Sequence, residues 1–123
     1  MKVRKYDLQE RFINYAVRII KVTEALPNTK TGNHIRTQML KSGTSPAANY
    51  GEAQSGESRK DFVHKMQIVL KELRETFICL KIIHRVKLYK SENKILEALS
   101  ENNELISIFV KSIETAKNNL NKI

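Results

Sequence analysis

Apolar residues recur at alternating spacings of four and three along three stretches of the chain. This spacing aligns apolar side chains along one side of an α-helix, as in the seam between packed helices. It predicts helices over about residues 7–25, over 58–88 and from 91 onward. Asn102 is a polar residue on the last seam, so we expect that helix to be locally loosened there. The predicted seam residues are Leu8, Phe12, Tyr15, Ile19, Val22 and Leu26, then Phe62, Met66, Val69, Leu73, Thr76, Leu80 and Ile83, and finally Ile95, Leu99, Asn102, Ile106, Phe109, Ile113, Ala116 and Leu120.

Residues with known preferences for helix ends mark the limits of these helices. Pro27 disfavours helical geometry in the residue before it, so the first helix ends there. Ser58 and Asp61 have the spacing of a capping box, in which side chains satisfy free backbone N–H groups at a helix start. Ser91 followed by Glu92 is typical of another start, with an acidic residue in the first turn.

The segment between Pro27 and Ser58 carries small residues instead of a full seam. Ile35 and Met39 follow a polar stretch, and glycine, alanine and serine then predominate, which would let a neighbouring backbone approach closely. Ser45-Pro46 resembles an N-cap with proline at the first helical position. It predicts a second helix that either kinks or breaks and restarts there. We favour the kink, and a poorly packed loop is the alternative.

Few residues in the chain favour turns. It contains 4 glycines and 2 prolines among 123 residues, which suits a few long elements better than many short strands. Four amphipathic helices joined by short links predict an all-α fold, an antiparallel four-helix bundle. No internal repeat or low-complexity linker divides the chain, so we expect one domain over residues 1–123. A chain of this length buries enough surface to fold without a disulfide or a metal.

Two groups of apolar residues fall outside the seams. One lies on another face of the first helix, and the other makes residues 76–83 apolar almost all round. A helix with more than one apolar face is covered on more than one side. Since a lone bundle covers only one side, these residues predict an interface between copies of the chain. The candidate interface residues are Ile13, Val17, Ile20, Ile78, Cys79 and Ile82.

The sequence lacks the patterns that catalysis or cofactor binding requires. None of the three histidines follows a glutamate at the three-residue spacing that di-iron bundles use. Ser42, Ser45 and Ser55 have no neighbouring histidine to activate them. Cys79 falls in the most apolar turn, where burial raises the pKa of a thiol and leaves it unreactive. Glycine motifs for phosphate binding are missing. We therefore expect no enzyme activity, no cofactor and no metal site.

The single cysteine cannot form an internal disulfide, which favours a reducing compartment. The first residues lead into no apolar signal core. Lys81 and His84-Arg85 interrupt the most hydrophobic stretch, well short of the ~18 apolar residues of a membrane span. We expect a cytoplasmic protein without membrane contact.

Polar residues recur at helical spacing through the small-residue segment. One interpretation is an enzyme site built between subunits. The other, which we favour, is a hydrogen-bonded network that fixes how the helices pack. This polar stripe consists of Gln38, Ser42, Ser45, Asn49 and Glu52.

The chain is strongly basic, with 22 lysines and arginines against 13 acidic residues and a formal charge of +9. No acidic residue lies between Thr76 and Ser91, and Lys2, Arg4 and Lys5 form a further basic group. Such a field attracts phosphate backbones without discriminating sequence, although small domains also use charge for solubility. The candidate contacts with RNA or DNA are Arg59, Lys60, Lys65, Lys81, Arg85, Lys87 and Lys90.

Eight short segments, spread over nearly the whole chain, resemble segments of a known protein family. They are Arg11-Phe12, Tyr15-Ala16-Val17, Ala25-Leu26-Pro27, Gly32-Asn33-His34-Ile35, Ser42-Gly43-Thr44-Ser45, Ala47-Ala48-Asn49-Tyr50-Gly51-Glu52-Ala53, Ser58-Arg59-Lys60-Asp61-Phe62 and Leu73-Arg74-Glu75-Thr76. Together they resemble the bacterial four helix bundle protein family, which is ribosomal-protein-S23-like and whose founding members are encoded by intervening sequences inside 23S ribosomal RNA genes. The chain departs from the family at Cys79, where a tryptophan is usual, and this leaves the packing of that turn open.

The resemblance implies an up-and-down left-handed four-helix bundle that assembles into a ring-shaped homopentamer. The family includes relatives of the accessory proteins of diversity-generating retroelements, which are basic pentamers that partner a reverse transcriptase and bind nucleic acid. It implies no catalytic residue. Two functions follow as expectations. One is a non-enzymatic oligomer that binds nucleic acid or a ribonucleoprotein, and the other is a protein-interaction scaffold whose charge serves solubility.

Overall fold

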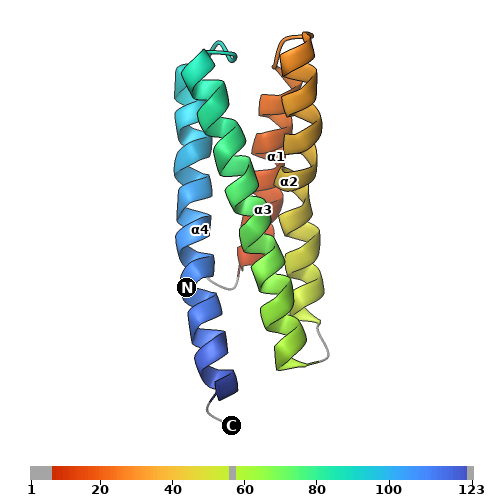
Figure 1. Ribbon diagram of the computed structural model, residues 1–123, viewed down its shortest axis with the longest axis vertical. Helices are drawn as coiled ribbons and strands as arrows, with labels where there is room; N and C mark the ends of the chain where they lie inside the picture. The colour runs from red at the N-terminus through yellow and green to blue at the C-terminus, as the bar shows by residue number, and fades with distance from the viewer. Residues whose placement is uncertain (1–6, 56–57, 122–123) are drawn as a thin grey trace.

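Four helices make up most of the chain in the computed structural model, which describes residues 7–55 and 58–121. They run alternately up and down, so that the α1–α2 and α3–α4 turns lie at one end, and the end of α2 and the start of α3 lie at the other (Figure 1). Each helix packs against the two beside it, and α1 is diagonal to α3. The prediction of an all-α four-helix bundle is confirmed. The helices are α1 (Leu8–Glu24), α2 (Lys30–Gln54), α3 (Arg59–Val86) and α4 (Glu92–Asn121).

The predicted caps of α3 and α4 are present. The Ser58 side chain accepts a hydrogen bond from the Asp61 backbone N–H at 3.0 Å, and an equivalent serine bond caps α4. α3 ends at Val86, slightly before the predicted limit, because Lys87 adopts a left-handed conformation with a φ of 54°. In this conformation two backbone N–H groups bond back to carbonyls of the last helical turn and close the helix.

The main correction concerns the start and the continuity of α2. It begins at Lys30, inside the polar stretch, because Thr29 Oγ1 accepts a hydrogen bond from the Gly32 N–H at 3.0 Å and caps the first turn. It then continues through Pro46 to Gln54 as one helix, which is compatible with the favoured kink. The two alternatives, a break with a restart and a poorly packed loop, are wrong. An internal proline costs a helix about 3 kcal/mol. The packing of α2 against α1 and α3 outweighs that cost.

At Gly43 the close neighbour is a side chain of α1, where the prediction was a backbone. A Cβ atom on this residue would lie 2.5 Å from Cγ2 of Ile19 in α1, which is inside van der Waals contact. Since glycine has no Cβ, α1 and α2 pack more closely here than a larger residue would allow.

The core contains an aromatic cluster around the ring of Phe12, on the predicted seam of α1. This ring lies 5.2 Å from that of Phe109, 5.5 Å from that of Tyr50 and 6.5 Å from that of Tyr15, measured between centroids. The rings of Phe109 and Tyr15 meet it edge to face, which is a favoured geometry for aromatic pairs. α1, α2 and α4 are thus joined through one aromatic cluster.

The predicted seam of α4 is partly out of register. Ala98 and Leu105 are fully buried, whereas the predicted Leu99 and Ile106 are half-buried. Because α4 packs against both α1 and α3, its buried stripe depends on two neighbours. The spacing along one helix does not reveal which of two adjacent apolar residues lies innermost.

The predicted loosening at Asn102 is wrong, since α4 is continuous there. Asn102 is fully buried, and its Nδ2 donates to the Tyr15 hydroxyl at 2.7 Å and to the Leu73 carbonyl at 3.0 Å. Thr76 also hydrogen-bonds the Tyr15 hydroxyl, and Thr76 Oγ1 lies 2.6 Å from Ser42 Oγ. Each of the four helices contributes to this core polar network. Buried polar groups bonded in this way favour one packing register over others.

Ion pairs join α1 to α4, the neighbouring helices with the least backbone contact. Arg11 donates to both carboxylate oxygens of Glu101, at 2.8 and 2.9 Å, and to Glu104 at 2.7 Å. These bonds raise the pKa of the Arg11 guanidinium. Arg18 lies 3.3 Å from Glu97 nearer the turns. Partly exposed pairs contribute about 0–1 kcal/mol each, so they do not replace the packing that the other helix pairs have.

Candidate functional site

The seven predicted contacts with nucleic acid separate into two groups. Arg59, Lys60 and Lys65 lie at the start of α3, whereas Lys81, Arg85, Lys87 and Lys90 lie at its end and in the α3–α4 turn. α3 has 28 residues. At about 1.5 Å per residue its ends are roughly 42 Å apart. The two groups are therefore separate clusters, and only an extended ligand could contact both.

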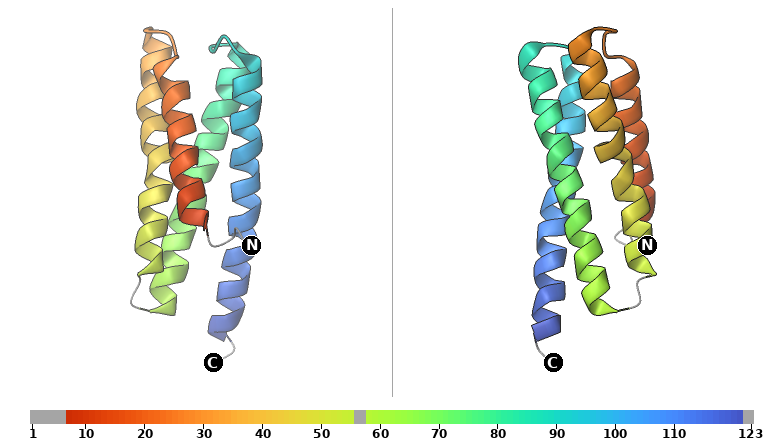
Figure 2. Two further views of the ribbon diagram at one scale, coloured as in Figure 1. Left: turned by 180° about the vertical axis from the view of Figure 1, so that it is seen from behind. Right: turned by 45° about the vertical axis from the view of Figure 1, so that its right-hand side comes forward.

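One group lies at the end of the molecule that holds the α1–α2 and α3–α4 turns (Figures 1 and 2). We call this the basic end and define it as residues 18–36 and 80–98. These residues include nine lysines and arginines and three glutamates. Among the described residues, no ion pair involves Arg85, Lys87 or Lys90. The bundle thus gathers charges from two hairpins, and these three remain uncompensated by a paired carboxylate.

Two other residues of the basic end have local contacts. Lys81 Nζ lies 5.4 Å from the centre of the Phe77 ring, within the range of a cation–π interaction. His84 Nε2 lies 2.9 Å from a carboxylate oxygen of Glu92, across the α3–α4 turn. The first contact orients a charge on the surface, and the second fastens the turn.

The other group of predicted contacts lies at the opposite end, which we define as residues 7–17, 48–55, 58–66 and 104–121. These residues include six basic and six acidic side chains. Lys65 Nζ lies 2.7 Å from Glu52, and this hydrogen bond raises the pKa of Lys65. The predicted basic group of Lys2, Arg4 and Lys5 lies outside the described residues. In the described part of the opposite end, acidic side chains therefore balance the charge of the basic candidates.

The predicted interface residues lie on two sides of the bundle. Ile13 and Val17 are 43% and 44% exposed and, with the half-buried Ile20, form what we call the α1 face. Ile78 and Ile82 are 56% and 45% exposed and form the α3 face. Because α1 and α3 are diagonal in the bundle, the two faces point in different directions.

Two residues change the composition of the predicted interface. Cys79 belongs to the core cluster and is only 9% exposed, so it offers little surface to a second chain. Burial raises the pKa of its thiol, in agreement with the prediction of an unreactive cysteine. Val86 is exposed and extends the α3 face. The signal that could have found it is its apolar side chain, four residues beyond Ile82.

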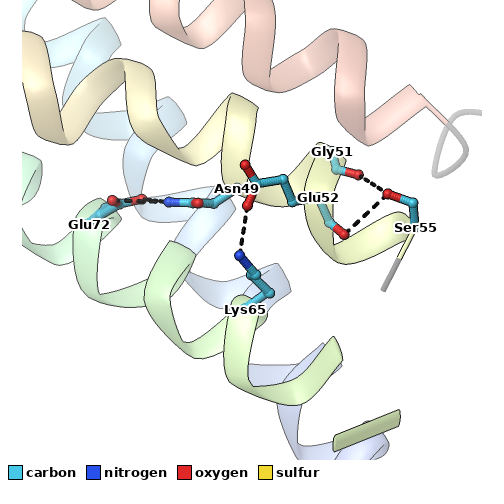
Figure 3. Close-up of polar contacts among 6 residues, drawn as sticks. All are labelled: Asn49, Gly51, Glu52, Ser55, Lys65 and Glu72. Carbon is cyan, nitrogen blue, oxygen red and sulfur yellow. Dashed lines mark hydrogen bonds and ion pairs between the residues drawn. The ribbon is translucent and has the colours of Figure 1, made fainter. Parts of the chain in front are cut away.

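The polar stripe of α2 makes contacts with α3 (Figure 3). Asn49 Nδ2 donates to both carboxylate oxygens of Glu72, at 3.1 and 3.2 Å, and Glu52 accepts the bond from Lys65. Burial raises the pKa of Glu72, although the bond from Asn49 opposes this. Ser42 belongs to the core polar network. These contacts support the interpretation that the stripe fixes helix packing.

Gln38, at the other end of the stripe, lines a hollow of about 580 Å³ between α2 and α3. Cys79 also lines this hollow, together with two lysines and two glutamates. The charges of these four side chains balance, and Lys71 lies 3.9 Å from Glu75. The hollow thus presents mixed polar groups without an excess of either charge.

Three lysines of the basic end are missing from the sequence prediction. Lys94 lies four residues beyond Lys90, in the first turn of α4, and this proximity in sequence could have identified it. Lys21 and Lys30 belong to the α1–α2 hairpin, far from the predicted cluster in sequence. Only the antiparallel packing of the two hairpins brings them to the same end.

Within residues 7–55 and 58–121, no group of three or more histidine, cysteine or acidic side chains could hold a metal ion. No helix in this described part of the chain is long and apolar enough to cross a membrane.

Comparison with known proteins identifies relatives of this bundle. The family model of the 23S rRNA-intervening sequence protein matches residues 4–111. A crystal structure of a protein with unknown function from the S23 ribosomal protein family of Bacteroides thetaiotaomicron VPI-5482 is similar, with 30% sequence identity and a TM-score of 0.78. This match covers 85% of the present chain and 96% of the other. A comparison with curated proteins finds no match. The family match extends over most of the sequence, and the chain therefore belongs to the 23S rRNA-intervening sequence protein family.

Proposed function

We propose that this protein is a non-enzymatic, cytoplasmic helical bundle that assembles into a ring and binds RNA or DNA, or a ribonucleoprotein, through its basic end. The observation that carries the proposal is the nine-to-three excess of basic over acidic side chains at that end. Arg85, Lys87 and Lys90 there have no ion-pair partner among the described residues. Phosphate backbones bind to such surfaces with release of counterions, without any requirement for a particular base sequence.

The two apolar faces support the assembly. The α1 face and the α3 face differ in their residues and lie on diagonal helices. An interface between two different faces is head-to-tail, and copies joined in this way form a ring when the rotation closes. The number of five comes from the family resemblance. A pentamer multiplies the +9 of one chain fivefold and presents several basic ends to one nucleic acid.

A salt titration tests the nucleic-acid proposal. The full chain is mixed with a labelled structured RNA, and the affinity is measured by gel shift at several salt concentrations. We expect the affinity to fall steeply with salt, with a slope of roughly 0.7–0.9 for each phosphate that the protein neutralises. Absence of binding at low salt would reject the proposal. Light scattering on a sizing column gives the number of chains in the same sample.

A second function is favoured by exposed apolar residues outside these two faces, Leu40 in α2 and Leu96 in α4. A ring with such surfaces could serve as a scaffold for another protein. The partner could be a reverse transcriptase or another protein, bound directly or through nucleic acid. A pull-down before and after nuclease treatment distinguishes the two functions. A partner that stays bound after the treatment favours the scaffold, and a partner that is lost favours nucleic-acid binding.

A further inference from the structure

A hollow of about 490 Å³ lies between α1 and α4 and extends to the α3–α4 turn. Figure 2 (left) views the bundle from the side on which these two helices lie nearest the reader. The volume falls within the range of about 300–1,000 Å³ that is usual for small-ligand sites. We call it the α1–α4 hollow. Its lining residues are Asn14, Val17, Arg18, Lys21 and Val22 of α1, Tyr89 of the turn, and Lys94 and Glu97 of α4.

The lining combines apolar walls with a cationic rim. Val22 is buried and Tyr89 is half-buried, so part of the wall belongs to the core. Lys21 and Lys94 come from different helices, are exposed, and have no ion-pair partner in the described part of the chain. Arg18 and Glu97 form a 3.3 Å pair that joins the two helices. An apolar, aromatic wall beside unpaired lysines suits a ligand that has a flat ring and a negative charge.

Tyr89 also lines a second hollow, of about 300 Å³. Lys87 and Lys90 line this second hollow, with His84 and Glu92. Tyr89 therefore borders two hollows, each of which is also lined by two lysines. A strand that passes from one hollow to the other would meet basic side chains in both.

From these observations we infer that the α1–α4 hollow receives one unpaired nucleotide of a single-stranded segment, with its base against Tyr89. Lys21, Lys94, Lys87 and Lys90 contact the flanking phosphates. The inference rests on the proposed function and specifies it, because a base inside a duplex is already stacked and cannot enter a hollow. Aromatic side chains beside a basic groove are the usual platform for single strands. Val17 is shared with the α1 face, so the hollow adjoins the boundary between neighbouring chains of a ring.

The experiment uses the full chain and a short single-stranded RNA that contains 2-aminopurine, whose fluorescence decreases when it stacks. The wild type is expected to bind this RNA and to quench it. The variant Tyr89→Leu keeps an apolar side chain but removes the aromatic ring. It should lose about tenfold in affinity for the single strand, together with the quenching. Tyr89→Phe should retain both. Binding to a duplex with the same number of phosphates should be the same in all three proteins.

A second variant addresses the lysines without touching packed residues. Lys21→Gln combined with Lys94→Gln should reduce the salt slope for the single strand by about 2. Both side chains are exposed, so this variant is expected to fold as the wild type does, and thermal unfolding verifies this.

The outcomes separate this inference from the proposed function. Wild-type affinity and quenching in Tyr89→Leu would overturn the inference and leave nucleic-acid binding in place. Failure of the wild type to bind any RNA at low salt would overturn both. Titration with uridine monophosphate alone tests whether the hollow binds a free nucleotide and not a nucleotide within a strand. If it binds at micromolar concentration while the strand does not, the hollow belongs to free nucleotides, and the inference is overturned.

Discussion

The basic end and the opposite end of this bundle contain the same number of charged residues and differ in how the signs are distributed. The basic end has nine basic and three acidic side chains, and the opposite end has six of each within its described residues. At the opposite end Lys65 is paired with Glu52, whereas Arg85, Lys87 and Lys90 at the basic end have no such pairing in the described chain.

This difference shows that the charge of +9 is not a uniform property of the surface. The attraction of a phosphate backbone depends on the local balance of charge, because fields are screened within about 10 Å in ordinary salt. Arg59 and Arg85 are separated by most of the length of α3, so their fields do not add. The comparison thus predicts that nucleic acid binds at the basic end and not at the opposite end.

The largest effect is expected from Ile78→Glu on the α3 face. A charge placed between subunits without a partner costs several kcal/mol, so the assembly should separate into smaller species. Binding of RNA should fall by about a hundredfold or more, because the basic ends no longer act together. Light scattering and gel shifts measure the two effects.

The control for this experiment is Ser100→Glu, which adds the same charge at an exposed position of α4. It should leave the mass unchanged. Ile78 is 56% exposed in the single chain, so its substitution is compatible with folding. An unchanged mass for Ile78→Glu would show that the α3 face is not an interface.

Removal of charge at each end gives the most direct comparison. The triple variant Arg85→Gln, Lys87→Gln and Lys90→Gln should weaken RNA binding by about a hundredfold at low salt, since each phosphate contact contributes to counterion release. The matched triple variant Arg59→Gln, Lys60→Gln and Lys65→Gln removes the same charge from the opposite end. This variant should reduce the affinity for RNA by less than about threefold, because we expect few phosphate contacts at that end. Equal losses would mean that net charge alone governs binding.

The two ends keep their separation only while the bundle core is folded. Tyr15, in the core polar network, allows the stability of this core to be measured. Burial raises the pKa of its hydroxyl to about 12. The folded bundle holds this proton more tightly than the unfolded chain does, where the pKa is about 10. The resulting stabilisation is complete below pH ~10 and is lost as the pH rises towards 12, by about 2 kcal/mol.

Denaturant unfolding of the wild type and of Tyr15→Phe, at several values between pH 8 and 12, measures this effect. The variant should be less stable at pH 8, because the bond from Asn102 Nδ2 loses its acceptor. It should also lose less stability than the wild type above pH 10. Parallel curves would show that Tyr15 does not titrate as a buried group.

The smallest effect is expected from Glu52→Gln at the opposite end. This substitution releases Lys65 from its 2.7 Å pair and removes one negative charge. Binding of RNA should increase by about twofold to threefold, because one further cation becomes available. Glu10→Gln serves as the control, since it removes the same charge without releasing a lysine. A decrease in RNA binding by Glu52→Gln would contradict the view that carboxylates weaken RNA binding at this end by neutralising its lysines and arginines.

Local sequence patterns were sufficient for those parts of the fold that depend on nearby residues in the chain. The seam of α1 from Phe12 to Leu26 is buried as its spacing predicts, and Ser58 and Ser91 cap the helices that follow them. The prediction succeeds there because helical period and capping depend on residues within about four positions of each other.

Contacts between the helices, by contrast, establish which residues share a surface. Neighbouring helices determine that α2 continues through Pro46 and that Ala98 is buried in place of Leu99. They also determine that Lys21 and Lys94 line the same hollow. The same holds for the division of the seven basic candidates between two ends. Packing energy and electrostatic fields act through space between residues far apart in the chain, and a pattern along one helix does not contain those distances.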